Sequence, residues 1–97
     1  MRRAAKRDSN EVEIIRLLRL AGCSVQQLSA PGVPDLLVGK NGVNVLLEIK
    51  DPAQPPYKRQ LTPDQVTWHL RWEGQVAVVE TADQSLSIVK LASCGDA

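Results

Sequence analysis

A chain of 97 residues, 43% hydrophobic and 24% charged, provides one domain and leaves no room for a second core. It has no Phe and only 3% aromatic residues, which excludes an aromatic core and counts against base-stacking modules such as RRM and OB folds. The net charge of +1 predicts nothing about nucleic acid by itself. We expect neither a signal peptide nor a membrane span, because no apolar run is long enough.

Positive charge gathers near the N-terminus, where four Arg and Lys residues precede the first acidic residue. We expect residues 1–7 to be a flexible basic arm, which either contacts phosphates or only keeps the chain soluble. Residues 8–97 are expected to form a single domain.

Cys23 and Cys94 are too few for a disulfide framework or a zinc site, so we expect free thiols in a reducing cytoplasm.

Residues 8–21 have the pattern of an amphipathic helix. Asp8-Ser9-Asn10-Glu11 is a capping-box pattern, and Gly22 favours a stop. Glu11 lies near the edge of the apolar stripe on a helical wheel and is expected to point toward the sheet. It either completes the cap with Asp8 or offers a carboxylate to a site. The apolar stripe consists of Ile14, Leu17, Leu18 and Ala21.

Short strands are predicted at residues 24–28, 35–38 and 43–50. Asn41-Gly42 lies between the last two and is typical of a two-residue hairpin turn, because both positions require positive φ. Alternate residues of the second hairpin strand are apolar and define its core face: Val43, Val45, Leu47 and Ile49.

This hairpin is expected to gather charged side chains. With the turn at 41–42, Asp35 faces Glu48, and Lys50 shares the face of Glu48. Opposed Cβ atoms lie roughly 4.5–5.5 Å apart, where like charges are destabilising. Singly, these residues fit a turn aspartate or a solvated strand face. Together, two facing carboxylates suit a hard divalent cation, with the backbone carbonyl of Ile49 as a further ligand.

Such a cation activates a bound water and polarises a phosphoryl oxygen, while Lys50 would orient the water or neutralise developing charge. The pattern therefore indicates hydrolysis of a phosphodiester.

Residues 51–61 are rich in proline and are predicted to have no regular structure. A second helix is then expected from Thr62, its N-cap, to about Glu73, with Gly74 as its stop.

Several side chains of this half allow both a structural and a functional interpretation. Gln65 either completes a capping box with Thr62 or reaches the acidic hairpin, and one amide is not expected to do both. His69 is either a general base or a partly exposed helix residue. Trp68 and Trp72 pack on the sheet or on a second copy of the chain. The loop residues that either touch a DNA backbone or are solvated are Tyr57, Lys58 and Arg59.

The chain ends with a predicted strand at residues 75–80 and a segment after Asp83 that fits either a short helix or a strand. The predicted order is αβββαβ with an undetermined tail, an α/β fold.

Segments 32–38 and 46–50 resemble the PD-(D/E)XK nuclease motif. Segments 61–65 and 74–79 resemble the VRR-NUC branch of that superfamily, and the resemblance extends over residues 11 to about 80. It implies a restriction-endonuclease-like α/β core, with a central mixed sheet flanked by helices. It also implies Mg²⁺- or Mn²⁺-dependent cleavage of DNA.

The resemblance implies roles for five residues. Asp35 and Glu48 would be metal ligands, Lys50 the catalytic lysine, Glu11 the acid of the first helix, and Gln65 the glutamine that opens the second helix. Stand-alone members are phage or bacterial proteins that resemble homodimeric Holliday-junction resolvases. We therefore expect a cytoplasmic enzyme, in a bacterium or a phage-infected cell, that acts on branched or four-way DNA. The alternatives are a flap or non-specific nuclease, or a non-catalytic DNA-binding module on the same scaffold.

Overall fold

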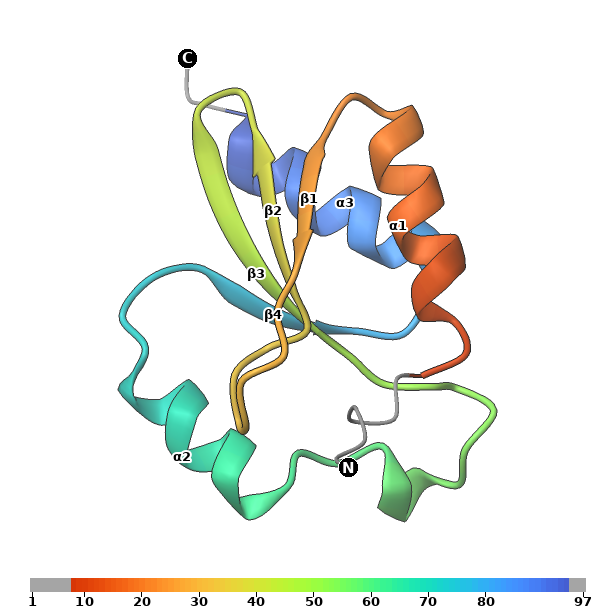
Figure 1. Ribbon diagram of the computed structural model, residues 1–97, viewed down its shortest axis with the longest axis vertical. Helices are drawn as coiled ribbons and strands as arrows, with labels where there is room; N and C mark the ends of the chain where they lie inside the picture. The colour runs from red at the N-terminus through yellow and green to blue at the C-terminus, as the bar shows by residue number, and fades with distance from the viewer. Residues whose placement is uncertain (1–7, 95–97) are drawn as a thin grey trace, which may run out of the picture.

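The computed structural model describes residues 8–94, so the basic arm predicted at residues 1–7 lies outside the described part. Four strands form one mixed sheet in the order β1-β2-β3-β4, in which only the β3–β4 pair is parallel (Figure 1). The elements are α1 (Glu11–Leu20), β1 (Ser24–Gln27), β2 (Leu36–Lys40), β3 (Val43–Ile49), the 3₁₀ turn η1 (Pro56–Lys58), α2 (Pro63–Arg71), β4 (Val76–Val79) and α3 (Ala82–Ser93). The predicted α/β core with a mixed sheet is confirmed.

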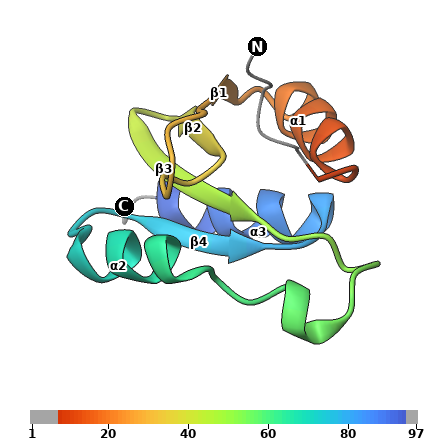
Figure 2. The same ribbon diagram turned by 60° about the horizontal axis from the view of Figure 1, so that its bottom comes forward.

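Two helices build the core against one face of this sheet. α1 and α3 pack on each other and on the strands, and α2 lies apart from both (Figure 2). The predicted core face of β3 is confirmed, because Val45, Leu47 and Ile49 share a buried aliphatic cluster with Ile14 and Leu18 of α1. No described helix has the length and apolar character needed to cross a membrane.

The β2–β3 hairpin has the predicted register. Asn41 and Gly42 form the turn with φ values of 52° and 80°, and Lys40 pairs with Val43. Asn tolerates this left-handed backbone better than most residues, and Gly adopts it freely. The antiparallel pairing continues as far as Leu36 opposite Leu47. This register determines toward which face of the sheet each side chain of the hairpin points.

The capping box predicted at the start of the first helix is wrong. α1 begins at Glu11 with Asn10 as N-cap, and the Asn10 side chain makes no capping hydrogen bond. Instead its Nδ2 donates to the carbonyl oxygens of Lys50, at 3.1 Å, and Glu80, at 2.8 Å. The Asn10 amide therefore bonds the residues that follow β3 and β4, and it connects the start of α1 to the ends of these strands.

The predicted stop at Gly22 is confirmed. Gly22 has a φ of 90°, and its N–H donates to the carbonyl of Arg19 at 3.0 Å. The N–H of Cys23 donates to the carbonyl of Leu18, also at 3.0 Å. This pair of bonds is a Schellman motif. Its left-handed position favours glycine, because glycine has no Cβ and adopts positive φ without steric cost.

Two predictions about the second helix and the loop before it are corrected. The loop contains one 3₁₀ turn, η1, where no regular structure was predicted. α2 ends at Arg71 and not near Glu73, and Gly74 is not among the residues with positive φ. Packing explains this glycine, because a Cβ there would lie 2.8 Å from Nε1 of Trp72.

The undetermined tail is helix α3. Thr81 is its N-cap, and its side chain accepts a hydrogen bond from the N–H of Gln84 at 3.0 Å. Val89 is 1% exposed and belongs to the core, so the tail completes the layer that α1 begins.

Candidate active site

The hairpin holds Asp35 directly beside Glu48. Asp35 lies one residue beyond the Leu36–Leu47 pair, and its N–H donates to the carbonyl of Leu47 at 3.0 Å. Its carboxylate Oδ2 accepts the backbone N–H of Ile49 at 2.7 Å. The predicted opposition of Asp35 and Glu48 therefore follows from the register, and a backbone donor fixes the aspartate.

Glu48 is a buried carboxylate, 2% exposed, on the face of β3 opposite the aliphatic core. Burial, followed by the adjacent charge of Asp35, raises the pKa of Glu48 to about 8. Lys50 acts in the opposite direction, and its Nζ lies 3.9 Å from Glu48 Oε2. The site is therefore built to favour a positive charge close to the two acids.

Gln65 links the glutamate to the lysine. From the first turn of α2 its Nε2 donates to Glu48 Oε2 at 3.0 Å, and its Oε1 accepts from Lys50 Nζ at 2.8 Å. The same Oε1 accepts the N–H of Thr62 at 2.9 Å, while the N–H of Gln65 donates to Thr62 Oγ1 at 3.3 Å. The expectation that one amide cannot serve both the cap and the site is wrong, because a carbonyl oxygen has two lone pairs.

His69 is a site residue whose position the sequence left open. Its Nε2 lies 3.9 Å from Glu48 Oε1, and both atoms are buried without a hydrogen-bond partner in the described part of the chain. Burial, and then the charge of Lys50, lower the pKa of His69. Its spacing of four from Gln65 could have revealed the placement, since residues i and i+4 share a helix face.

Glu11 points inward as predicted but has a partner on β1. It is 2% exposed, and its Oε2 accepts from Nε2 of Gln27 at 2.9 Å. Within residues 8–94, no group of three or more His, Cys, Asp or Glu side chains is arranged to hold a metal ion. The role of Glu11 as a ligand thus stays a prediction.

Asp8 is an acid near the site that the sequence assigned to the helix cap. Its pKa is raised, first by burial and then by the charges of Asp35 and Asp51. Lys50 lowers it. The Asp8 side chain lines the same groove as Lys50. The sequence did not indicate that this carboxylate lies near the candidate site.

The donor set fits a hard divalent cation. Asp35 and Glu48 supply carboxylate oxygens, and Oε1 of Glu48 is buried without a hydrogen-bond partner among the described residues. A cation between the two acids would satisfy this oxygen and offset the burial and the repulsion by Asp35, which together raise the pKa of Glu48. The backbone carbonyl of Ile49 stays a predicted further ligand.

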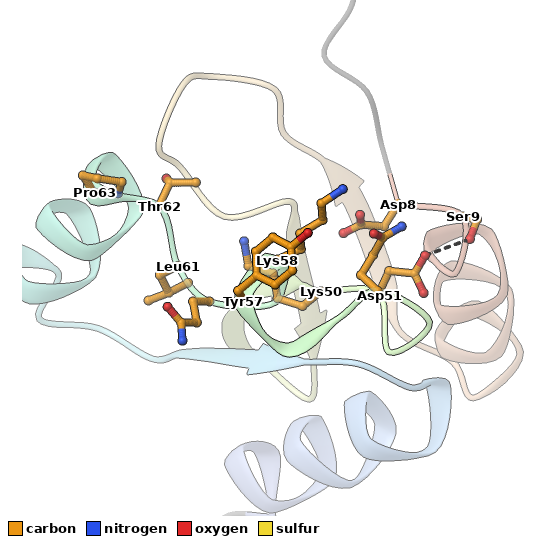
Figure 3. A pocket seen from close by; sticks show the side chains of 11 residues that line it. Asp8, Ser9, Lys50, Asp51, Tyr57, Lys58, Leu61, Thr62 and Pro63 are labelled. Atoms are coloured by element: carbon orange, nitrogen blue, oxygen red, sulfur yellow. Dashed lines mark hydrogen bonds between the residues drawn. The ribbon is translucent and has the colours of Figure 1, made fainter.

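An open groove of about 720 Å³ adjoins these residues. It lies between the start of α1, the end of β3, η1 and the start of α2. In Figure 3 Tyr57 and Lys58 overlap Lys50 in the middle of the view, and Asp8, Ser9 and Asp51 are grouped to the right of it. The groove is lined by polar side chains and connects solvent with the buried Lys50.

Comparison with known proteins supports the motif. No protein-family model matches the chain, and no curated protein matches it significantly. A solved structure described as a VRR_NUC domain does match, with a TM-score of 0.60 and 27% identity. The match covers 84% of this chain and 95% of that chain. With the motif residues gathered on the expected fold, this match confirms the predicted resemblance of the chain to the VRR-NUC domain.

Proposed function

We propose that this protein is a metal-dependent, structure-selective DNA endonuclease that hydrolyses phosphodiester bonds. The observation that carries the proposal is the adjacent pair Asp35 and Glu48, in which the burial of Glu48 and then the charge of Asp35 raise the pKa of Glu48 to about 8. Lys50 and Gln65 complete the cluster through a hydrogen bond of 2.8 Å. The similarity to a VRR_NUC domain supports nuclease activity in general.

In the proposed mechanism Asp35 and Glu48 would hold Mg²⁺ or Mn²⁺. When bound, the metal supplies an activated water and stabilises charge on a phosphoryl oxygen. Lys50 stabilises the negative charge that develops as the phosphodiester is attacked. Gln65 keeps Lys50 and Glu48 in fixed positions through hydrogen bonds of 2.8 and 3.0 Å. The N–H of Ile49 orients Asp35 from the other side.

The proposed substrate is branched DNA, in particular a four-way junction, and the proposed assembly is a homodimer. A junction needs two symmetric cuts, which two copies related by a two-fold axis can make. A candidate dimer surface lies on α2, where Leu70 is 82% exposed and Trp72 44% exposed beside its stacked neighbour Trp68. We place the enzyme in the cytoplasm of a bacterium or a phage-infected cell.

The test is cleavage of labelled four-way junctions, flaps and plain duplex with Mg²⁺ or Mn²⁺. We expect Asp35→Ala and Lys50→Ala to lose at least about 100-fold in rate, the scale typical of removing one electrostatic catalytic group. Lys90→Ala, which removes an exposed lysine from α3, should cleave normally. Calorimetric titration with Mn²⁺ should show that Asp35→Ala also loses metal binding. Full activity in either site variant would refute the assignment.

Two alternatives are decided by the same experiments. A flap or non-specific nuclease would cut flaps or duplex as fast as junctions, and light scattering would then find a monomer. A non-catalytic DNA-binding module would bind DNA without metal and cleave none of the substrates. The acid pair argues against this module, because Asp35 and Glu48 would repel a polyanion and contribute nothing to its binding.

A further inference from the structure

We propose that the groove beside Lys50 holds one unpaired nucleotide next to the scissile phosphate, with its base stacked on Tyr57 and its phosphate contacted by Lys58. This inference rests on the proposed nuclease function and names the local substrate structure that the site selects. It assigns a role to η1, whose residues Tyr57 and Lys58 have no part in the proposed mechanism.

The groove has room for a nucleotide. Its volume of about 720 Å³ lies within the roughly 300–1,000 Å³ typical of small-molecule sites. Lys50 is buried at the groove, which is also lined by the exposed side chains of Tyr57, Lys58 and Thr62 (Figure 3). A nucleotide in the groove would therefore lie next to a phosphate bound at Lys50.

Tyr57 is displayed on a short, stiff turn. Its side chain is 71% exposed, although the ring is large and apolar. Pro56 opens η1 and Pro55 is its N-cap, and the N–H of Lys58 closes the turn on the carbonyl of Pro55 at 2.9 Å. Proline fixes φ, so the backbone that carries the ring has little freedom. A fixed, exposed aromatic ring at the edge of a groove is suited to stack a base.

The structure separates the two cations of this loop. Arg59 is paired with Glu80 at 3.4 Å, whereas Lys58 has no ion pair in the described part of the chain. Acidic side chains also line the groove, and Ser9 and the N–H of Ala53 hold one of them, Asp51, in place. A phosphate is attracted to Lys58 and repelled by these acids, so we place the phosphate of the nucleotide at Lys58.

Stacking on Tyr57 selects an unpaired base. In a continuous duplex both faces of a base are covered by its neighbours, so a protein ring reaches a base only where the stack is broken. Branch points and flaps provide such a base without the cost of unstacking one. The groove thus provides a physical reason for structure selectivity within a single copy of the chain.

Binding should be measured by fluorescence anisotropy on the full chain, with Ca²⁺ in place of Mg²⁺. One probe is a duplex with a single-stranded flap that carries 2-aminopurine at its first unpaired position, and the other is the same duplex fully paired. Tyr57→Ala should weaken binding of the flap probe by about 5- to 100-fold, the range expected for loss of one base stack. It should abolish the quenching of 2-aminopurine and leave duplex binding unchanged, whereas Tyr57→Phe should behave as the wild type.

Lys58→Ala should weaken binding of both probes and reduce the salt dependence by about one phosphate contact. Lys90→Ala is the matched control for loss of one exposed lysine and should change neither. Because Tyr57 is exposed, its variants should keep the circular dichroism spectrum of the wild type.

The inference is overturned if Tyr57→Ala binds and quenches normally, if it weakens both probes equally, or if the wild type binds neither. A wild type that stacks the base but cleaves no DNA with Mg²⁺ or Mn²⁺ would contradict the proposed nuclease function alone. A wild type that cleaves DNA while Tyr57→Ala is indistinguishable from it would contradict the stacking alone.

Discussion

Without metal, the fold should lose stability as pH rises, because Glu48 resists ionisation only in the folded chain. Its pKa is raised from 4.5 to about 8, first by burial and then by Asp35. Between these values the unfolded chain releases a proton that the folded chain retains, so the free energy of unfolding falls with pH. The contribution is fully present below pH 4.5 and is lost by about pH 8. At about 1.36 kcal/mol per pH unit, the loss is at most about 5 kcal/mol, less if water enters the site.

The perturbation is Glu48→Gln, which keeps the size of the side chain and removes its charge. We expect the variant to match the wild type near pH 4.5 and to be more stable by several kcal/mol, at most about 5, at pH 8 in EDTA. Urea unfolding followed by circular dichroism from pH 4.5 to 8 measures the difference. His69 titrates with the opposite sign, because its pKa is lowered, but it is present in both proteins.

Saturating Mg²⁺ should restore wild-type stability at pH 8 and have no such effect on the variant, since a bound cation favours the ionised glutamate. Parallel pH profiles for the two proteins in EDTA would refute the reasoning. They would mean that the acid pair is solvated and not held under repulsion.

Three other predictions concern the supports of the site. Thr62→Ala should cost about 1 kcal/mol as a lost helix cap. Gln65→Ala should cost more and also slow the proposed cleavage, because it removes the hydrogen bond to Lys50; equal urea midpoints and rates for these two variants would contradict the dual role. Asn10→Ala should cost about 2 kcal/mol by leaving two strand-end carbonyls without their donor, and a change under about 0.5 kcal/mol, the range of neutral surface substitutions, would exclude that clamp. Gly74→Ala should cost about 1–3 kcal/mol by overpacking against Trp72 and should shift tryptophan fluorescence, whereas a neutral result would argue that the indole moves away freely.

The hairpin was predictable because its information is local. Asn41-Gly42 specifies a turn type, the turn specifies the register, and the register specifies which side chains face each other. The position of Asp35 opposite Glu48 follows from these steps without knowledge of the rest of the fold. The same holds for Gly22 and Thr62, whose capping roles depend only on the backbone of one helix end.

Asn10 and Asp8 were mispredicted because their partners are distant in the chain. The motif at residues 8–11 is a good local cap, yet the Asn10 amide bonds two carbonyls that lie 40 and 70 residues away in sequence. The sequence of one helix does not indicate that the ends of β3 and β4 lie beside its first turn. Gly74 was misassigned for a related reason, since a stacked indole and not the backbone requires glycine.

Gln65 explains why the site and the fold are hard to separate in this chain. Its amide closes the first turn of α2 on Thr62 and, at the same time, positions Lys50 and Glu48. The backbone of α2 lies close to the sheet at few points, and this amide links the first turn of α2 to the end of β3. His69, one turn further along, faces the same glutamate. Gln65 and His69 thus connect α2 to the proposed site, and a change of charge at Glu48 should alter the docking of α2 as well as the proposed chemistry.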